Sequence, residues 1–243
     1  MKLEWEGTVD CDLENALIEV KHLSHQYKPG ELILDNISFS IHSGEKIALV
    51  GDNGAGKSTL FQLLVGLLPM QGGEIFALSE LMSDESDFVK MREFAGLVFQ
   101  DPDDQLFCPS VLEDVMFGPL NQGYSVKQAA KKSQEMLERL ELSHLSQRMA
   151  ADLSGGEKRL VALAAVLVMQ PKVLLLDEPT NALDSHSKKR LISVLASLDQ
   201  AMLIISHDED FLARLTTRSL FLKNANLTAG KSVINSHLGV KSV

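Results

Sequence analysis

The sequence predicts an α/β fold in which a mostly parallel sheet is covered by helices, with an antiparallel β edge and an inserted α-helical subdomain. Short, continuously apolar segments that have the length of buried strands alternate with helix-like segments, which is typical of parallel sheets with both faces covered. A mostly helical stretch, residues 101–152, interrupts this alternation. The chain has 243 residues, which suits one large domain or a core domain with a small insertion.

The first hundred residues carry the expected β edge and the first parallel strands. Residues 1–16 are polar and irregular, and we expect an N-terminal extension there. Residues 17–20 and 37–41 alternate between apolar and polar side chains, as half-buried strands do. The polar residues 79–92 are assigned no element. Further strands are expected at residues 46–50, 75–77 and 95–99.

The rest of the chain is expected to hold the helical subdomain and then the remainder of the core. Asp101 and Pro102 break the strand pattern, and residues 111–117 and 126–140 have apolar side chains at helical spacing. Beyond the subdomain we expect helices at residues 160–169 and 187–198 and strands at residues 173–176 and 202–205. The expected division is a core of residues 17–100 and 153–225, a helical subdomain of residues 101–152 and a C-terminal tail of residues 226–243.

Composition excludes some classes of function. The formal net charge of −10 argues against a nucleic-acid-binding surface, which needs clustered Lys and Arg. The longest apolar run, residues 160–169, is shorter than the roughly 18–20 residues that span a bilayer. The N-terminus does not have the pattern of a signal peptide, and Cys11 and Cys108 lack metal-like spacing. We therefore expect the protein to be in the reducing cytosol. Any membrane role must then come through a partner.

A glycine-rich segment, GDNGAGKST at residues 51–59, lies between the apolar strand and a helix-like run. It matches the pattern Gly-x4-Gly-Lys-[Ser/Thr], whose backbone N–H groups surround nucleotide phosphates at a helix N-terminus. Lys57 is expected to reach the β- and γ-phosphates, and Ser58 to ligate Mg²⁺. The remaining residues expected to bind nucleotide here are Gly51, Asn53, Gly54, Gly56 and Thr59. The segment predicts a P-loop nucleotide site.

Further candidate residues follow the other buried strands. Asp177 ends the strand at residues 173–176 and is expected to help hold Mg²⁺, while Glu178 would point elsewhere by strand alternation and polarise an attacking water as a general base. Gln100 can reach the metal or the water, and His207 can contact the γ-phosphate, because catalytic groups collect at the carboxyl ends of parallel strands. Each taken alone has an ordinary alternative: a solvated turn for the acids, an exposed Gln, a capping His.

A second candidate phosphate site lies far away in the sequence. Ser154, Gly155 and Gly156 precede a long helix, and their backbone N–H groups with the Ser hydroxyl can bind an oxyanion. The same Ser-Gly-Gly sequence is also a common way to begin a helix, so this segment alone does not decide between the two.

In this order and spacing, the motifs resemble the nucleotide-binding subunits of ATP-binding-cassette (ABC) transporters over roughly residues 17–222. The resemblance implies ATP as the nucleotide, Mg²⁺ as its metal, and ATP hydrolysis by Glu178, His207 and Gln100. Tyr27 resembles the aromatic residue that stacks on adenine, although a lone loop tyrosine is normally packing. In this family residues 153–157, the signature motif, close over ATP bound to another subunit. The chain is therefore expected to form a homodimer or to pair with a similar ATPase.

One stretch is similar to a particular branch of this family. The segment VFQDPDDQLF, residues 98–107, with EDVMFGPLN after it resembles the ATPases of energy-coupling-factor importers, especially those for cobalt and nickel. There, residues corresponding to 100–121 receive coupling helices from a transmembrane partner. Asp103 and Asp104 can pair with basic residues on such helices, or each can be an acidic helix cap. The resemblance implies a peripheral protein on the cytoplasmic face of the cell membrane.

Several departures and alternatives remain at this point. Ala182 stands where this family usually has Gly, Glu157 where many members have Gln, and the core pattern ends soon after Leu222, where many energy-coupling ATPases continue. Vitamin or other small-solute import, a soluble ABC ATPase outside transport, and an ATP-binding regulatory module are the alternative functions. His22 and His25 have His-x-x-His spacing but lack a third metal ligand.

Overall fold

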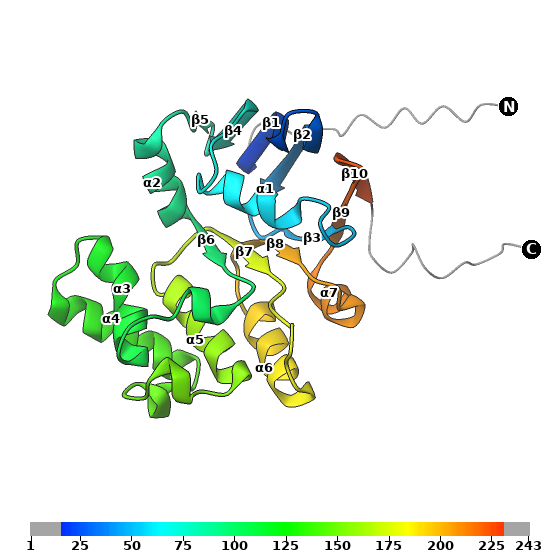
Figure 1. Cartoon of the computed structure of the whole chain (residues 1–243). Coiled ribbons are helices and arrows are strands. Elements are labelled where there is room, and N and C mark those ends of the chain that lie inside the picture. The colour runs from blue at the N-terminus through cyan, green and yellow to red at the C-terminus, as the bar shows by residue number, and fades with distance from the viewer. Residues whose placement is uncertain (1–15, 231–243) are drawn as a thin grey trace, which may run out of the picture.

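The computed structural model describes residues 16–230, which form two sheets and the helices around them (Figure 1). The expected N-terminal extension before residue 16 and the expected tail beyond residue 230 lie outside the described residues. Within the described range, none of the helices combines the length and apolar character needed to cross a bilayer.

The larger sheet has the order β10-β9-β3-β8-β7-β6 across residues 16–230. Its strands β3, β6, β7, β8 and β9 are parallel, and β10 pairs antiparallel with β9. The central strands β7 and β8 are buried along their whole length because their side chains are apolar on both faces. The bounds are β3 Lys46–Val50, β6 Ala95–Val98, β7 Val173–Asp177, β8 Ala201–Ile205, β9 Arg218–Lys223 and β10 Asn226–Gly230.

The smaller sheet forms the predicted antiparallel β edge. It has the order β2-β1-β4-β5 within the described part of the chain. Its apolar face packs with helix α1 (Lys57–Leu64) against one face of the parallel sheet, in a core that includes Phe39, Phe61 and Leu175. The bounds are β1 Ala16–Lys28, β2 Glu31–His42, β4 Gly72–Ala77 and β5 Glu80–Leu81.

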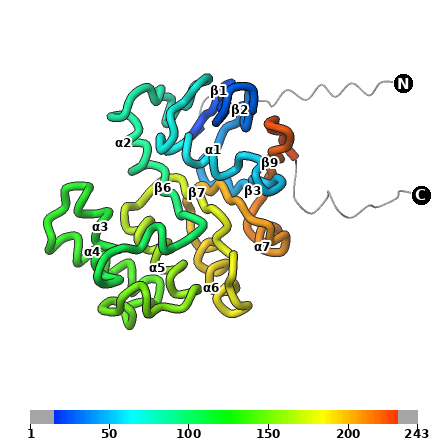
Figure 2. The backbone as a smooth tube through the Cα atoms, viewed as in Figure 1, coloured from blue at the N-terminus to red at the C-terminus, as the bar shows by residue number. Residues whose placement is uncertain are grey.

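The opposite face of the parallel sheet is covered by helices α3 to α7. Alternate residues of β7 show the two cores directly: Val173 and Leu175 face the antiparallel sheet, while Leu174 and Leu176 face the helices. The backbone trace in Figure 2 shows α3, α4 and α5 grouped away from β1 and β2. The bounds are α3 Val111–Asn121, α4 Val126–Arg139, α5 Gly155–Leu167, α6 Ser185–Ala196 and α7 Glu209–Leu215, with short 3-10 turns at Pro102–Asp104, Ser143–Leu145 and Ala150–Asp152.

Several elements occupy ranges in which none was expected: β5, α7 and β9, and also α2 and β10. Helix α2 (Glu85–Phe94) lies in the polar stretch, where Asp84 caps its N-terminus and only Phe88 and Met91 are buried, so the apolar signal was weak. Strand β10 lies in the range expected as a tail. Its hairpin with β9 turns through Asn224 and Ala225, both with positive φ (50° and 64°), and an alanine there is not a usual turn signal.

Helix α5 begins earlier than the expected residues 160–169. Ser154 accepts a hydrogen bond from the N–H of Glu157, and the Glu157 side chain accepts one from the N–H of Ser154, which together form a capping box. The apolar run marks only the buried part of the helix. The exposed first turn, which carries Gly155 and Gly156, is specified by the cap.

Candidate nucleotide-binding and catalytic site

The phosphate-binding loop connects the end of β3 to the start of α1. Gly56 precedes the helix with φ of 102°, a conformation that favours glycine, and a Cβ there would lie 2.6 Å from Cγ2 of Ile33. The loop is therefore fixed both by its own conformation and by strand β2 beside it. It presents the N-terminus of α1 to the adjacent cavity, as the sequence predicts.

Lys57 lies at the centre of this loop. Its ammonium donates to the carbonyl oxygens of Gly51 at 2.7 Å and Asp52 at 2.9 Å. Burial lowers the pKa of Lys57, and the nearby charges of Glu178, Asp177 and Asp52 oppose that effect. The ammonium is thus bonded to its own loop while lying beside the two acids at the end of β7.

A cavity of about 650 Å³ opens beside the loop and collects residues from separate parts of the chain. Ile33 and Asn181, which the sequence analysis did not select, also line it. Gly51 contributes a carbonyl to Lys57 but is not among the lining residues. The predicted residues that line the cavity are Tyr27, Asn53, Gly54, Gly56, Lys57, Ser58, Thr59, Gln100, Asp177, Glu178 and His207.

Asp177 ends β7 with a buried carboxylate beside the hydroxyl of Ser58. Burial raises the pKa of Asp177, while the hydrogen bond from Ser58 and the charge of Lys57 lower it. Among the described residues, no group hydrogen-bonds its Oδ1 atom. A buried carboxylate oxygen without a donor, next to a hydroxyl oxygen, fits the hard oxygen ligands of Mg²⁺.

This pair would supply only part of a coordination shell. In residues 16–230 no group of three or more His, Cys, Asp and Glu side chains gathers as a metal site. In nucleotide sites Mg²⁺ is usually held by one or two carboxylates together with substrate phosphates and water.

Glu178 follows directly, but its direction has a different cause from the one expected. Strand alternation was the predicted reason, whereas β7 ends at Asp177 and Glu178 has φ of 46° in the left-handed region. Its N–H donates to the carbonyl of Ile205 at 2.9 Å, which holds this turn against β8. A non-glycine residue held in this conformation costs about 1–3 kcal/mol and is found preferentially at functional sites.

The turn brings Glu178 against His207. Oε1 of Glu178 lies 3.4 Å from Nε2 of His207, and Oε2 accepts a hydrogen bond from the His207 N–H at 3.3 Å. The Glu178 side chain is 14% exposed and the His207 side chain 57%. The carboxylate thus lies in the cavity wall, and the imidazole lies toward its opening.

Gln100 reaches the same cavity from the end of β6. Arg159 of α5 donates to the carbonyl of Gln100 at 2.9 Å and to the carbonyl of Asn181 at 3.0 Å. Burial lowers the pKa of Arg159, and the charges of Asp101 and Glu178 oppose this. Arg159 therefore joins two cavity loops, a role that sequence spacing alone did not reveal.

Tyr27 lies at the end of β1 on the rim of the cavity. Its hydroxyl is 3.0 Å from Oγ1 of Thr59, and the residue is 58% exposed. His25 packs against this ring edge-on, with centroids 5.1 Å apart. His25 is buried there and His22 bonds Asn36 at 2.8 Å, so both histidines have packing or hydrogen-bonding roles in the β edge.

Ser154, Gly155 and Gly156 do not join the cavity among the described residues that line it. They form the exposed first turn of α5, where hydrogen bonds from the Ser154 hydroxyl and N–H lower the pKa of Glu157. This second predicted phosphate site is therefore separate from the first within one chain.

The loop, its lysine and the strand-end acid beside it define a P-loop nucleoside triphosphatase. A family model described as "ABC transporter" matches residues 34–181. The chain belongs to the ABC transporter family, as an ATP-binding subunit with an ATPase domain. Both the resemblance and the fold class inferred from the sequence are confirmed.

Relatives agree with this assignment. The chain is 52% identical to a putative ABC transporter ATP-binding protein of Brucella suis over 82% of this chain and 83% of that one. It is 39% identical to the energy-coupling factor transporter ATP-binding protein EcfA of Methanothermobacter thermautotrophicus, over 88% of this chain and 70% of that one.

Solved structures show the same architecture. The cbiO1 protein of Clostridium perfringens, part of the ABC transporter complex cbiONQ, is 36% identical with a TM-score of 0.79, and the match covers 90% of this chain and 89% of that one. A bacterial ABC transporter cassette, solved as a dimer, is 29% identical with a TM-score of 0.78, covering 88% and 98%.

Proposed function

We propose that this ATPase forms a dimer around two ATP molecules and drives import through the membrane partners of an energy-coupling-factor transporter. The observation that carries the catalytic part is the single cavity in which Lys57, Asp177, Glu178 and His207 meet. The importer branch is supported by the likeness to EcfA and to a subunit of the cbiONQ complex.

The nucleotide would be held by the phosphate loop and the cavity rim. Backbone N–H groups of residues 53–59 and the Lys57 ammonium bind phosphate oxygens, and the ammonium exchanges its bonds to the Gly51 and Asp52 carbonyls for them. Tyr27, exposed at the rim, offers its ring face to adenine. Ser58, Asp177 and Gln100 would hold Mg²⁺, which neutralises charge on the β- and γ-phosphates.

Hydrolysis would then depend on the two residues at the ends of β7 and β8. Glu178 would orient a water and take its proton, because its carboxylate lies in the cavity wall, where that water would stand. The same carboxylate lies 3.4 Å from the imidazole of His207. His207 contacts the γ-phosphate from the open side. Gln100 places the same water or metal from β6.

The dimer follows from the separation of the two phosphate sites. Ser154, Gly155 and Gly156 present a capped helix N-terminus on a surface away from the chain's own cavity. A second subunit, identical or similar, would place this turn over the nucleotide bound here. The likeness to a cassette solved as a dimer supports this arrangement.

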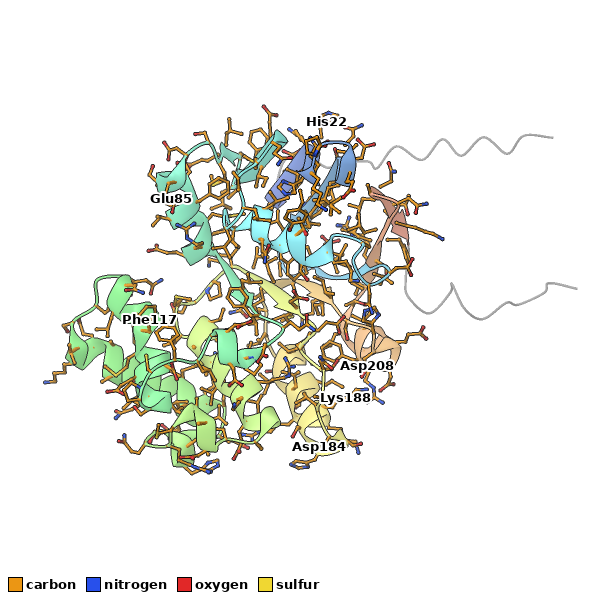
Figure 3. The ribbon with its side chains drawn as sticks, viewed as in Figure 1. His22, Glu85, Phe117, Asp184, Lys188 and Asp208 are labelled. Carbon is orange, nitrogen blue, oxygen red and sulfur yellow. The ribbon has the colours of Figure 1, made fainter. Side chains whose placement is uncertain are left out.

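The membrane partner would bind a groove between α2 and α3. This groove has a volume of about 560 Å³ and is largely apolar. Phe107 and Phe117 are exposed there, and their rings pack edge-on with centroids 5.0 Å apart. Figure 3 shows Phe117 on α3 facing the side of the molecule that carries α2. An apolar groove with an acidic edge suits an amphipathic helix with basic residues.

The acidic edge is not quite the one expected. Asp103 pairs with Lys158 of the same chain at 2.6 Å, whereas Asp104 lines the groove. Asp114 lines it too: its Oδ1 accepts the N–H groups of Phe107 and Cys108, and its buried Oδ2 has no partner within residues 16–230. Asp104 and Asp114 are therefore better placed than Asp103 to contact basic residues of the membrane partner. In this arrangement the protein is peripheral, on the cytoplasmic face of the membrane.

The proposed cargo is a cobalt or nickel ion, because residues 98–107 resemble the ATPases of cobalt and nickel importers. A vitamin or another small solute is the alternative. Co-purification from native membranes tests the proposal, followed by transport of radiolabelled cobalt, nickel and vitamins by the recovered complex. Recovery with multi-span membrane proteins and ATP-dependent uptake of one cargo would support it. A chain that is recovered without membrane proteins and still hydrolyses ATP would contradict the transport role.

A further inference from the structure

An ion pair joins helix α6 to the segment that carries His207. Lys188, in the first turn of α6, pairs through its ammonium with the carboxylate of Asp208. Asp208 also accepts the N–H of Phe211 at 3.0 Å and so caps α7. Figure 3 shows Lys188 between Asp184, at the start of α6, and Asp208.

This contact lies one residue from the catalytic pair. The backbone N–H of His207 and its ring both face Glu178, at 3.3 Å and 3.4 Å. On the other side of His207, the buried Ser206 hydroxyl lies 3.1 Å from the hydroxyl of Thr180 and accepts the N–H of Asp208 at 3.1 Å. The backbone of His207 is therefore held from both neighbours, and the ion pair between Lys188 and Asp208 adds a restraint on the residue that follows it.

The charges on Asp208 favour this restraint. Burial alone would raise the pKa of Asp208, but the hydrogen bonds from Lys188 and the N–H of Phe211 outweigh it and lower that pKa. Asp210 also lies 3.9 Å from the Lys188 ammonium, yet it is 61% exposed and forms its own pair with Arg214 at 3.2 Å. Asp210 thus offers a matched control that touches the same lysine without adjoining His207.

The same turn of α6 also contacts the second phosphate site. Ser187, next to Lys188, donates its hydroxyl to Asp184 at 2.8 Å. Ser187 packs so closely on Gly156 that a Cβ at Gly156 would lie 2.4 Å from its Oγ. The first turn of α6 therefore touches the helix start that faces the partner and, through Lys188, the segment that faces the chain's own nucleotide.

We propose that Lys188 is a positioning residue that holds His207 against Glu178 through Asp208, on a helical turn that Ser187 fixes against Gly156. The proposal rests on the proposed function, in which Glu178 and His207 act on ATP bound by this chain and Gly156 faces ATP bound by its partner. Closure of the dimer on the partner's nucleotide would thereby align the catalytic pair of this subunit.

The test compares Lys188→Met, Lys188→Arg, Asp210→Asn and Asp208→Asn in the full-length protein, alone and within the purified transporter. Lys188→Met keeps the length of the side chain and removes its charge. We expect its kcat for ATP hydrolysis to fall about tenfold, as for a catalytic group displaced by a fraction of an ångström, with KM for ATP unchanged. Lys188→Arg should recover the rate, and Asp210→Asn should keep it.

Combining Lys188→Met with Asp208→Asn should cost no more than Asp208→Asn alone, since the lysine acts through that aspartate. The imidazole NMR signals of His207 should shift in Lys188→Met and not in Asp210→Asn, a readout that needs no turnover. The proposal would be overturned if Lys188→Met kept a normal kcat, or if the losses in kcat from Lys188→Met and Asp208→Asn were additive. It would also be overturned if Asp210→Asn lowered kcat as much as Lys188→Met does. A wild-type protein without ATPase activity would instead overturn the proposed function, while a normal His207 signal in Lys188→Met would overturn the positioning role in either case.

Discussion

Gly156 and Ser187 lie in such close contact that no side chain fits between them: a Cβ on Gly156 would be 2.4 Å from Oγ and 2.8 Å from Cβ of Ser187. Gly155, its neighbour in the same helical turn, is open, and a Cβ there meets no described atom within 4 Å. The two glycines of the signature therefore have different physical reasons to be glycine. Gly156 is required by packing within its own chain.

This difference predicts opposite effects on stability. Gly155→Ala should leave the free energy of unfolding unchanged or raise it by up to about 1 kcal/mol, because alanine is the better helix former. Gly156→Ala should lower it by about 1–3 kcal/mol through overpacking. Adding Ser187→Gly to Gly156→Ala should recover part of that loss. Urea unfolding measures all three, and equal stability of the two alanine variants would refute the packing argument.

Removal of the phosphate-binding ammonium should severely weaken nucleotide binding or turnover. Lys57→Ala removes the charge that lies between the phosphate loop and the two acids at the end of β7. We expect ATP affinity or turnover to fall severely, while the fold persists because the lysine bonds only carbonyls of its own loop. Fluorescent-ATP titration and a phosphate-release assay check this. ATPase activity near the wild-type rate would mean that the loop is not the phosphate site.

The groove acids should control binding to the membrane partner. Reversing Asp103 and Asp104 to Lys is expected to spare ATP binding and uncouple the partner, with Asp104→Lys responsible for most of the effect because it lines the groove. Asp103→Lys alone mainly breaks an exposed pair with Lys158, which is worth less than about 1 kcal/mol. Co-purification with the membrane subunits distinguishes them. Full association of Asp104→Lys would exclude this acid from the contact.

Cys108 should react slowly despite its partial exposure. Burial, then the hydrogen bond with Asp114 and the charges of Asp114 and Glu113, raise the pKa of Cys108 to about 11. A thiol with the ordinary pKa of about 8.5 would be largely ionised at pH 9, so we expect alkylation there to be on the order of 10²-fold slower for Cys108. The rate should climb up to about pH 11. Iodoacetamide labelling of Cys11→Ser protein measures it, with Asp114→Asn expected to speed the reaction.

Much of the fold could be predicted because its signals are local. The strands β7 and β8 are continuous apolar runs, and α4 has clear helical spacing and a Ser125–Gln128 capping box. Helix α2 could not be found in this way, since it buries only Phe88 and Met91 and depends on its Asp84 cap. The hairpin at Asn224 and Ala225 likewise depends on positive φ angles, which an alanine in the sequence does not predict.

The sequence predicted which residues form the candidate site better than it predicted how those residues are oriented. Motif spacing selected Lys57, Asp177, Glu178 and His207, and the cavity contains all four. Spacing did not indicate that Glu178 would take a left-handed turn, because that turn depends on the hydrogen bond to Ile205 of another strand. Arg159 was missed for the same reason, since its partners lie 59 and 22 residues away in the sequence.

The central claim is that Glu178 is the general base of a site completed by a second subunit, and Glu178→Gln tests it most directly. The substitution keeps the size and most hydrogen bonding of the side chain and removes the proton acceptor, which typically costs about 10²–10⁴-fold in rate. Lys57, Ser58 and Asp177 remain to hold the nucleotide, so ATP should stay bound between two subunits.

The measurement is the oligomeric state of Glu178→Gln by size-exclusion chromatography with ATP and Mg²⁺, alongside its rate of phosphate release. We expect a catalytically inactive protein that elutes as a stable ATP-dependent dimer, while the wild type returns to its looser state. Adding Ser154→Arg should abolish the trapped dimer by obstructing the partner's phosphate site. Hydrolysis by Glu178→Gln at the wild-type rate would contradict the catalytic assignment, and an inactive variant that never tightens its dimer with ATP would contradict the shared site.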